Sequence, residues 1–202
     1  MLNKLKKIDL KYLVVEKLLL ILGIISLRIN IFLYMGRLKI KKNYKIWGSI
    51  RFLIQGDGEI KIGNDFHAVS SRKRSYLTIF SPCHLTSFDG GKIQIGNHVG
   101  INGDTIAARK FIEIGDETMI APNVLITDHD GHSHKPELRW TDRGEAKEIY
   151  IGKRCWIGAN CIILKGAEIG ENTIIGAGSV VSGKCEKNSV YAGNPAKKIR
   201  NL

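Results

Sequence analysis

The chain has 202 residues, 44% of them hydrophobic and 25% charged, a length and composition that predict one domain with a sizeable core plus an appendage. No nucleic-acid recognition motif accompanies its net charge of +12, and the basic residues are interleaved with aliphatic ones, which argues against a nucleic-acid partner. The four cysteines show neither a metal-site spacing nor a disulfide framework, which argues against both kinds of site.

Residues 1–50 are predicted to form a basic, apolar arm that contains a helix. Residues 1–51 hold twelve Lys and Arg against Asp9 and Glu16, a net charge of +10. The most apolar run, LLLILGIISL at residues 18–27, is about half as long as the ~20 residues that span a bilayer. Two alternatives stay open: the arm lies on an anionic membrane surface, or it docks as a helix on the folded domain or on a neighbouring subunit.

Residues 51–190 are predicted to form a parallel β-helix, because aliphatic residues recur six positions apart. The most regular series is Ile151, Ile157, Ile163, Ile169, Ile175 and Val181. Four positions after the first five members come the small or β-branched residues Cys155, Cys161, Ala167, Thr173 and Ser179. A period of six matches neither a helix nor a simple strand. It fits hexapeptides that form the sides of a triangular coil of about 18 residues, with the aliphatic and the small residue pointing inward.

The repeat breaks between Ile126 and Ile151, which predicts an extruded loop at about residues 132–150. Long loops within compact repeats are usually functional. His129 lies at the base of this loop, in the stretch TDHDGH, at a corner of the coil that points outward. The sequence therefore predicts one extruded loop with a polar site beside it.

Residues 191–202 are predicted to leave the β-helix as a basic tail that begins near GNPAK. Further upstream, Cys155, Cys161 and Cys185 occupy small inward positions, where compact apolar side chains are expected. Buried, reduced thiols favour a cytoplasmic protein. If the arm binds the membrane, this protein would lie on its inner face.

Residues 93–200 resemble the hexapeptide-repeat acetyltransferases, which have a left-handed parallel β-helix. They are most similar to the galactoside and maltose acetyltransferases and to the O-acetyltransferases of capsule and O-antigen synthesis. The stretches that carry the resemblance are IEIGDETMIAPNVLITDHDGH, IGKRCWIGANCIILKGAEIGENTIIGAGSVVSG and VYAGNPAKKIR. The resemblance implies an acetyl-CoA-dependent O-acetyltransferase that acts on a carbohydrate, assembles as a homotrimer and uses no metal.

The resemblance also implies roles for individual residues. His129 matches the catalytic histidine, a general base that takes the proton of the attacking hydroxyl. Asp128 and Asp130 are both candidates for orienting its ring. Asn102 resembles an asparagine that contacts the acceptor, and Trp140 is a candidate for stacking on a sugar. The implied cofactor-binding residues are Trp156, Ala159, Ala177, Ser182, Lys197 and Arg200.

Several alternatives remain open from the sequence. The basic arm favours a surface-polysaccharide precursor as acceptor, but a small soluble sugar, an amino sugar or a drug would suit the same core. A zinc enzyme of the γ-carbonic-anhydrase type needs three converging ligands, and His67, His84 and His98 lack that family's paired spacing. A noncatalytic scaffold would have no reason to keep His129 beside both a loop and a cationic tail.

Overall fold

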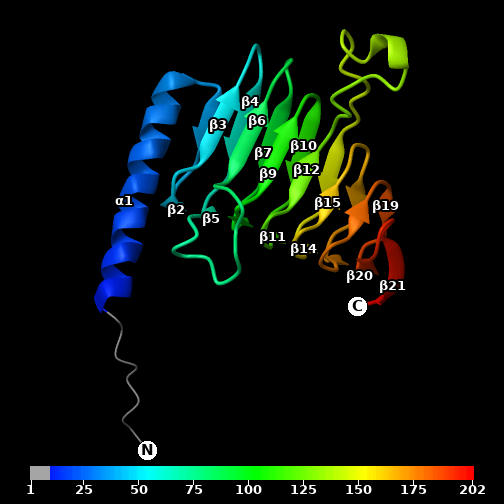
Figure 1. The fold of residues 1–202 in the computed structure, drawn as a ribbon. Helices are drawn as coiled ribbons and strands as arrows, with labels where there is room; N and C mark the ends of the chain where they lie inside the picture. Colours follow the sequence, from blue (N-terminus) through cyan, green and yellow to red (C-terminus); the bar gives the residue numbers. More distant parts are fainter. Residues whose placement is uncertain (1–9) are drawn as a thin grey trace, which may run out of the picture.

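The computed structural model describes residues 10–202, which form an N-terminal helix and a left-handed parallel β-helix (Figure 1). The strands belong to three sheets, here called A, B and C, one on each side of a triangular coil. Each coil takes one strand from each sheet in turn, so sequence neighbours lie in different sheets and pair with strands of the next coil. The predicted fold class is confirmed.

Sheet A contains β1 (Leu38–Ile40), β4 (Glu59–Ile62), β7 (Lys92–Ile95), β10 (Phe111–Ile114), β13 (Ile149–Ile151), β16 (Glu168–Ile169) and β19 (Lys184–Cys185). Sheet B contains β2 (Lys45–Gly48), β5 (His67–Ser70), β8 (Gly100–Asn102), β11 (Met119–Ile120), β14 (Trp156–Ile157), β17 (Ile174–Ile175), β20 (Ser189–Ala192) and β21 (Lys197–Asn201). Sheet C contains β3 (Arg51–Ile54), β6 (His84–Ser87), β9 (Thr105–Ala108), β12 (Leu125–Thr127), β15 (Ile162–Ile163) and β18 (Val180–Val181).

The core is a stack of aliphatic side chains, as the six-residue period predicts. Ile151 pairs with Ile169, Ile157 with Ile175 and Ile163 with Val181, so each aliphatic residue lies on its counterpart one coil later. The predicted inward small residues are buried as well, among them Cys155, Cys161, Ala167, Thr173 and Ser179. A single coil cannot bury its inner face alone, so the stacking itself stabilises the domain.

The cysteines are structural. All four are free and buried. Burial raises the pKa of Cys83 to about 12 and that of Cys185 to about 11, which keeps these groups as neutral thiols near neutral pH. They therefore fill space in the core.

Glycine follows the aliphatic residue at the corner between sheets A and B, because the next coil passes too close for a side chain. A Cβ on Gly115 would lie 2.5 Å from the nitrogen of Lys153, and one on Gly152 would lie 2.6 Å from the nitrogen of Glu171. Asn172, at the same kind of corner, and Asn160, at the corner between sheets B and C, take left-handed backbone with φ of 54° and 58°, a conformation that asparagine tolerates.

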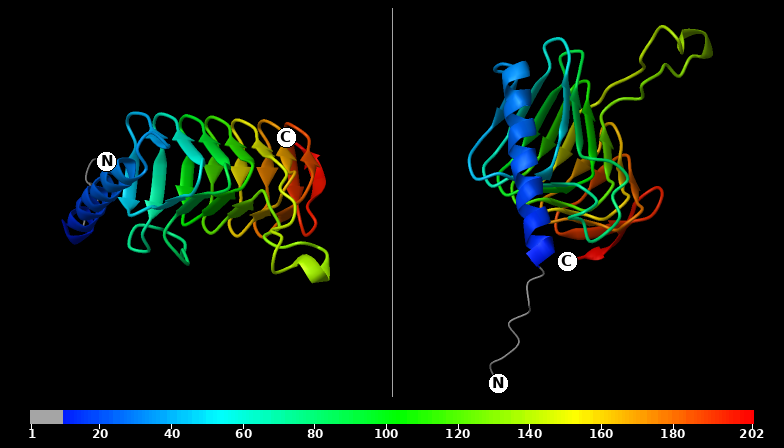
Figure 2. Two further views of the ribbon diagram at one scale, coloured as in Figure 1. Left: turned by 90° about the horizontal axis from the view of Figure 1, so that it is seen from above. Right: turned by 60° about the vertical axis from the view of Figure 1, so that its left-hand side comes forward.

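Both ends of the β-helix are covered, which protects exposed strand edges from pairing with other chains. At the first coil, α1 (Leu10–Leu33) packs across β2, and a Cβ on Gly23 would collide with the carbonyl oxygen of Ile46. Figure 2 shows α1 lying across this end. At the other end, β21 pairs antiparallel with β20, so the tail adds a strand to sheet B. Within residues 10–202, no helix has the length and apolarity needed to cross a bilayer.

The structure differs from the sequence prediction at two places. The first coil begins with β1 at Leu38, so the predicted arm, residues 1–50, also contains β1 and β2. A second loop, residues 71–83, leaves the coil between β5 and β6. Asn123 holds this loop from a distant part of the chain: its Oδ1 accepts from Phe80 N at 2.9 Å, and its Nδ2 donates to Thr78 O at 2.9 Å.

Candidate active site

His129 lies at the corner where the chain passes from sheet C to sheet A, directly after β12. The turns that lead from a sheet C strand to the next sheet A strand are here called the C–A corner. In the coil of β12 this corner carries the extruded loop, which runs between β12 and β13 and contains the short 3₁₀ helix η1 (Pro136–Leu138). The loop projects away from the body of the β-helix (Figures 1 and 2).

Asp128 points into the corner and is completely buried, with 0% of its surface exposed. Its Oδ1 accepts from Arg109 N at 2.8 Å, and its Oδ2 accepts from Lys110 N at 2.7 Å and Phe111 N at 2.8 Å. Three backbone donors thus compensate a carboxylate that would otherwise be costly to bury. The same contacts bind the corner of one coil to the next.

The ring of His129 is held from two directions. Nδ1 lies 3.1 Å from Asp128 Oδ1 and 3.2 Å from Thr127 Oγ1. The ring of Phe88 meets the imidazole edge-on, with centroids 4.9 Å apart and an interplanar angle of 89°. Because a carboxylate only accepts hydrogen bonds, this contact places the imidazole proton on Nδ1 and leaves the lone pair on Nε2. Asp128 therefore acts on the ring and not on a ligand directly.

Asp130, the other candidate for orienting the ring, is engaged elsewhere. Its Oδ2 lies 2.8 Å from His134 Nε2 and forms an ion pair with Lys165. Burial opposes ionisation of Asp130, but the hydrogen bonds from Lys165 and His134 outweigh it, and the pKa of Asp130 lies below its ordinary value. Of the two carboxylates, the structure brings only Asp128 to the imidazole of His129.

His129 lines two pockets. One, of about 400 Å³, is lined by His129, Lys165 and Ser182 among others. The other, of about 480 Å³, lies under the extruded loop and is lined by His129, Phe88 and Trp140 among others. A residue that lines two hollows can contact one ligand in each.

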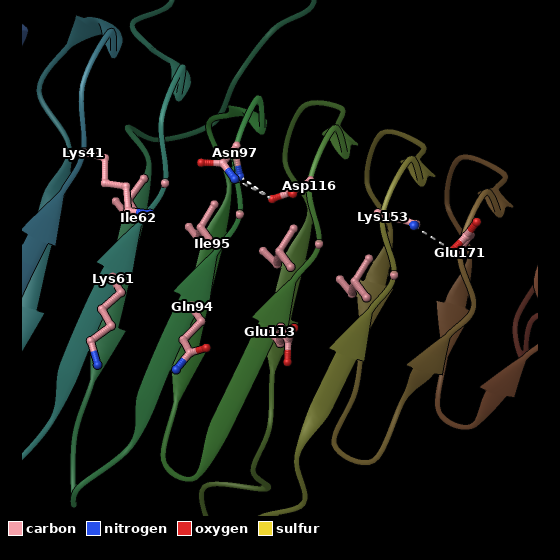
Figure 3. A pocket seen from close by; sticks show the side chains of 16 residues that line it. Lys41, Lys61, Ile62, Gln94, Ile95, Asn97, Glu113, Asp116, Lys153 and Glu171 are labelled. Atoms are coloured by element: carbon pink, nitrogen blue, oxygen red, sulfur yellow. Dashed lines mark hydrogen bonds and ion pairs between the residues drawn. The ribbon is translucent and has the colours of Figure 1, made fainter.

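A larger groove of about 590 Å³ runs along the corner between sheets A and B (Figure 3). Some of its polar groups pair with each other: Asn97 N donates to Asp116 Oδ1 at 2.6 Å, and Lys153 lies 3.5 Å from Glu171. Among the described residues, none of the sequence-predicted site residues lines it. The chemistry therefore favours the smaller pockets at the C–A corner over this groove.

Arg109 fixes the base of the extruded loop. Its guanidinium donates to the carbonyl oxygens of Arg143 and Gly144, each at 2.8 Å. His129 and Ala146 add an isolated antiparallel bridge. Trp140, by contrast, is 96% exposed in this single chain.

We expect Arg109→Ala to loosen the extruded loop while the β-helix stays folded. The substitution removes two charge-assisted hydrogen bonds, so trypsin should cut in this loop at least about ten times faster. Limited proteolysis followed by mass spectrometry measures the rate. Arg154→Ala is the matched control, because Arg154 pairs with Glu171 at 2.7 Å on a different corner. Equal cleavage rates in the two variants would contradict the anchoring role of Arg109.

The structure brings together some of the predicted site residues and separates others. Ser182 lies at the C–A corner with His129, and Trp140 lies in the loop above it. The remaining predicted residues lie on sheet B or at the turns that follow it: Asn102, Trp156, Ala159, Ala177, Lys197 and Arg200. Within residues 10–202, the Oδ1 of Asn102 is buried without a hydrogen-bond partner. Within one chain, the predicted residues at the C–A corner and those on sheet B therefore lie on different parts of the β-helix.

Sequence reasoning missed Phe88, Arg109 and Lys165, which contact the site from other coils. All three occupy C–A corners, in the turns after β6, β9 and β15. Extending the hexad register to every turn of this corner would have singled out these positions.

Comparisons with known proteins agree with this architecture. A family model described as bacterial transferase hexapeptide (six repeats) matches residues 148–183. The putative lipopolysaccharide biosynthesis O-acetyl transferase WbbJ of Escherichia coli is 34% identical over 165 residues, which are 75% of this chain and 77% of that protein. The galactoside O-acetyltransferase of E. coli is 39% identical over 114 residues, 56% of each chain.

Solved structures share the fold. The polySia specific acetyltransferase NeuO superposes with a TM-score of 0.53 at 26% identity, over 81% of this chain and 70% of that one. The N-acyltransferase AntD of Bacillus cereus has a TM-score of 0.63 at 23% identity, over 85% and 87% of the two chains, which shows the fold alone. Since the match to WbbJ extends over three quarters of both chains, this protein belongs to the hexapeptide-repeat acetyltransferases.

Proposed function

We propose that this acetyltransferase moves the acetyl group of acetyl-CoA to a hydroxyl group of a carbohydrate, with His129 as general base and without a metal. The observation that carries the proposal is the position of His129: its ring contacts buried Asp128, and the residue lines two pockets. The donor thioester would enter from the pocket beside Ser182, and the acceptor from the pocket under the extruded loop.

The proposed reaction needs one base and no covalent enzyme intermediate. The acceptor oxygen attacks the thioester carbonyl carbon while Nε2 of His129 takes the hydroxyl proton. The tetrahedral intermediate collapses, the carbon–sulfur bond breaks, and the thiolate of coenzyme A receives the proton from His129. The hydrogen bond from Nδ1 to Asp128 stabilises the imidazolium that exists between these two transfers.

The cofactor site is completed by a neighbouring subunit in this proposal. Ser182 lies at the C–A corner, whereas Ala159 and Ala177 follow sheet B strands and Lys197 and Arg200 lie on β21. A closed homotrimer joins two different surfaces at each interface, which allows the C–A corner of one subunit to face sheet B of the next. Acetyl-CoA would bind in that interface in the cytoplasm, with its phosphates beside the basic residues of β21.

An interfacial site predicts complementation between two inactive variants. His129→Ala removes the base, and Ala177→Trp obstructs the cofactor surface at an exposed position. Co-expression should restore activity, because one of the three interfaces in each mixed trimer combines an intact His129 with an intact Ala177. Differently tagged subunits allow mixed trimers to be purified and assayed. Activity that stays at the level of the single variants would contradict the interfacial site.

The acceptor pocket suits a sugar, because Phe88, His129 and Trp140 line it together with Arg143. Aromatic faces and fixed hydrogen-bond donors are the usual means of orienting a polar ring in a pocket. Two relatives are named as a lipopolysaccharide biosynthesis O-acetyl transferase and a galactoside O-acetyltransferase. The first name and the basic front end together favour a surface-polysaccharide precursor over a small soluble sugar, an amino sugar or a drug.

The proposed reaction is tested by release of the coenzyme A thiol in the presence of matched acceptors. Pairs of hexoses and the corresponding amino sugars, free and as nucleotide sugars, separate hydroxyl from amine acceptors. If acetyl is transferred to a carbohydrate hydroxyl, the hexose of each pair should support release of coenzyme A. The corresponding amino sugar should then give no faster release than the hexose. Thiol release with the amino sugars alone would contradict O-acetylation and would show that the enzyme acetylates nitrogen.

A further inference from the structure

Helix α1 has a much larger apolar surface than the stripe that packs against the β-helix. Leu19 and Leu27 are buried at 9% and 1% exposure, and Gly23 lies against the edge of β2. Beside and beyond this stripe, the helix carries large apolar side chains that are 51% to 74% exposed: Leu18, Ile21, Leu22, Ile25, Ile29 and Phe32. This surface is here called the outer face of α1.

An apolar face of this extent in water indicates a binding surface. Monomeric soluble proteins rarely expose a contiguous apolar patch of more than a few hundred Å². A helix that is apolar on nearly all sides is normally buried on all sides. Within residues 10–202 the β-helix covers only one side of α1, so the outer face is available to a partner.

The charges around the outer face are basic. Lys17 and Arg28 are exposed at the two ends of its central apolar stretch. Glu16, the acidic residue in the described part of α1, lies 3.5 Å from Arg74 in the second loop. That loop also exposes Arg72 and Lys73 beside the helix.

The second loop adds an aromatic side chain beside the helix. Tyr76 is 91% exposed, and its ring centroid lies 5.7 Å from the guanidinium of Arg74, which pairs with Glu16 of α1. The pocket between α1 and the turns from sheet B to sheet C, lined by Leu22 and Ile25 among others, has a volume of about 480 Å³. The helix and the first part of the loop thus present apolar side chains and cations at one end of the molecule.

We propose that the outer face of α1, together with residues 71–76, binds the surface of an anionic lipid bilayer. Apolar side chains would enter the boundary between headgroups and acyl chains, while Lys17 and Arg28 reach the anionic headgroups along their flexible stems. Because α1 lies across the end of the β-helix, this face is a terminal surface of the domain and can lie flat on a membrane (Figure 2). A second copy packed face to face would instead bring the same cations together, which is unfavourable.

The test is flotation of the full chain with vesicles of phosphatidylcholine, alone or mixed with phosphatidylglycerol. The wild type should float with the mixed vesicles and far less with phosphatidylcholine alone, and added salt should weaken its binding. Ile21→Glu/Ile25→Glu should bind the mixed vesicles at least about ten-fold more weakly, because two charges enter the apolar face. Leu202→Glu, at the opposite end and 50% exposed, is the matched control and should float like the wild type.

The paired variant Lys17→Gln/Arg28→Gln tests the charge separately. Both side chains are exposed, so the fold should persist while partitioning to the mixed vesicles falls about thirty-fold. Circular dichroism melting and thiol release with a soluble acceptor verify each variant's fold and activity.

Two results would overturn membrane binding. One is a wild type that stays unbound with both kinds of vesicle. The other is an Ile21→Glu/Ile25→Glu variant that still floats like the wild type. If the wild type does not float and light scattering shows that this variant has lost its subunits, the outer face is a contact between copies.

Discussion

Replacing His129 by alanine is expected to lower kcat for acetyl transfer roughly 10²–10⁴-fold, the usual contribution of a general base. Among the described residues, His129 is the only one that lines both pockets, so the variant retains the other donor and acceptor surfaces but lacks the base. Its side chain is only 13% exposed, yet it belongs to the corner and not to the aliphatic core. The β-helix should therefore stay folded and keep its affinity for coenzyme A.

The measurement compares kcat and coenzyme A binding in the variant and the wild type. His98→Ala is the matched control, because His98 is 64% exposed and pairs with Asp65 on another corner. The control should keep wild-type turnover. A His129→Ala enzyme with wild-type kcat would remove the base assignment.

Replacing Asp128 by alanine is expected to lower both stability and turnover. Three backbone N–H groups lose their acceptor in a fully buried corner, and each unsatisfied buried donor costs about 1–3 kcal/mol. The free energy of unfolding should fall by about 3 kcal/mol or more. Turnover should fall as well, because the imidazole loses the partner that fixes its tautomer and orientation.

Asp128→Asn separates the two effects. The amide has nearly the same shape and keeps a carbonyl oxygen, so it should retain more stability than alanine, while its neutral side chain stabilises the imidazolium less. Urea unfolding gives the stability of each variant and thiol release gives its turnover. An Asp128→Ala protein as stable as the wild type would show that the three backbone donors do not depend on this carboxylate. Full turnover in both variants would show that His129 needs no partner.

The β-helix could be predicted because its signal is local. Each hexad from Ile151 to Val181 places one aliphatic residue inward, and the pairing of Ile151 with Ile169 follows from the period alone. The loop at residues 71–83 gives no such signal. Its position depends on Asn123, a residue that comes close only after two further coils have stacked.

The candidate site could be predicted from the sequence in part, for the same reason. His129 lies within a motif that the sequence displays, whereas Phe88 reaches it from an earlier coil and Lys165 from a later one. The choice between Asp128 and Asp130 depends on which carboxylate points inward at the corner. The alternation of outward and inward side chains in β12 continues past the strand, so Asp128 points inward. At that buried position its carboxylate meets three backbone N–H groups.

The central claim, transfer of acetyl to a carbohydrate hydroxyl with His129 as base, is tested most directly by mass spectrometry of the acceptor. Wild type and His129→Ala are incubated with acetyl-CoA and a panel of simple sugars, nucleotide sugars and lipid-linked glycan precursors. We expect one member of the panel to gain one acetyl ester with the wild type and at least about 100-fold less with the variant. No gain on any carbohydrate, or an equal gain with both enzymes, would contradict the claim.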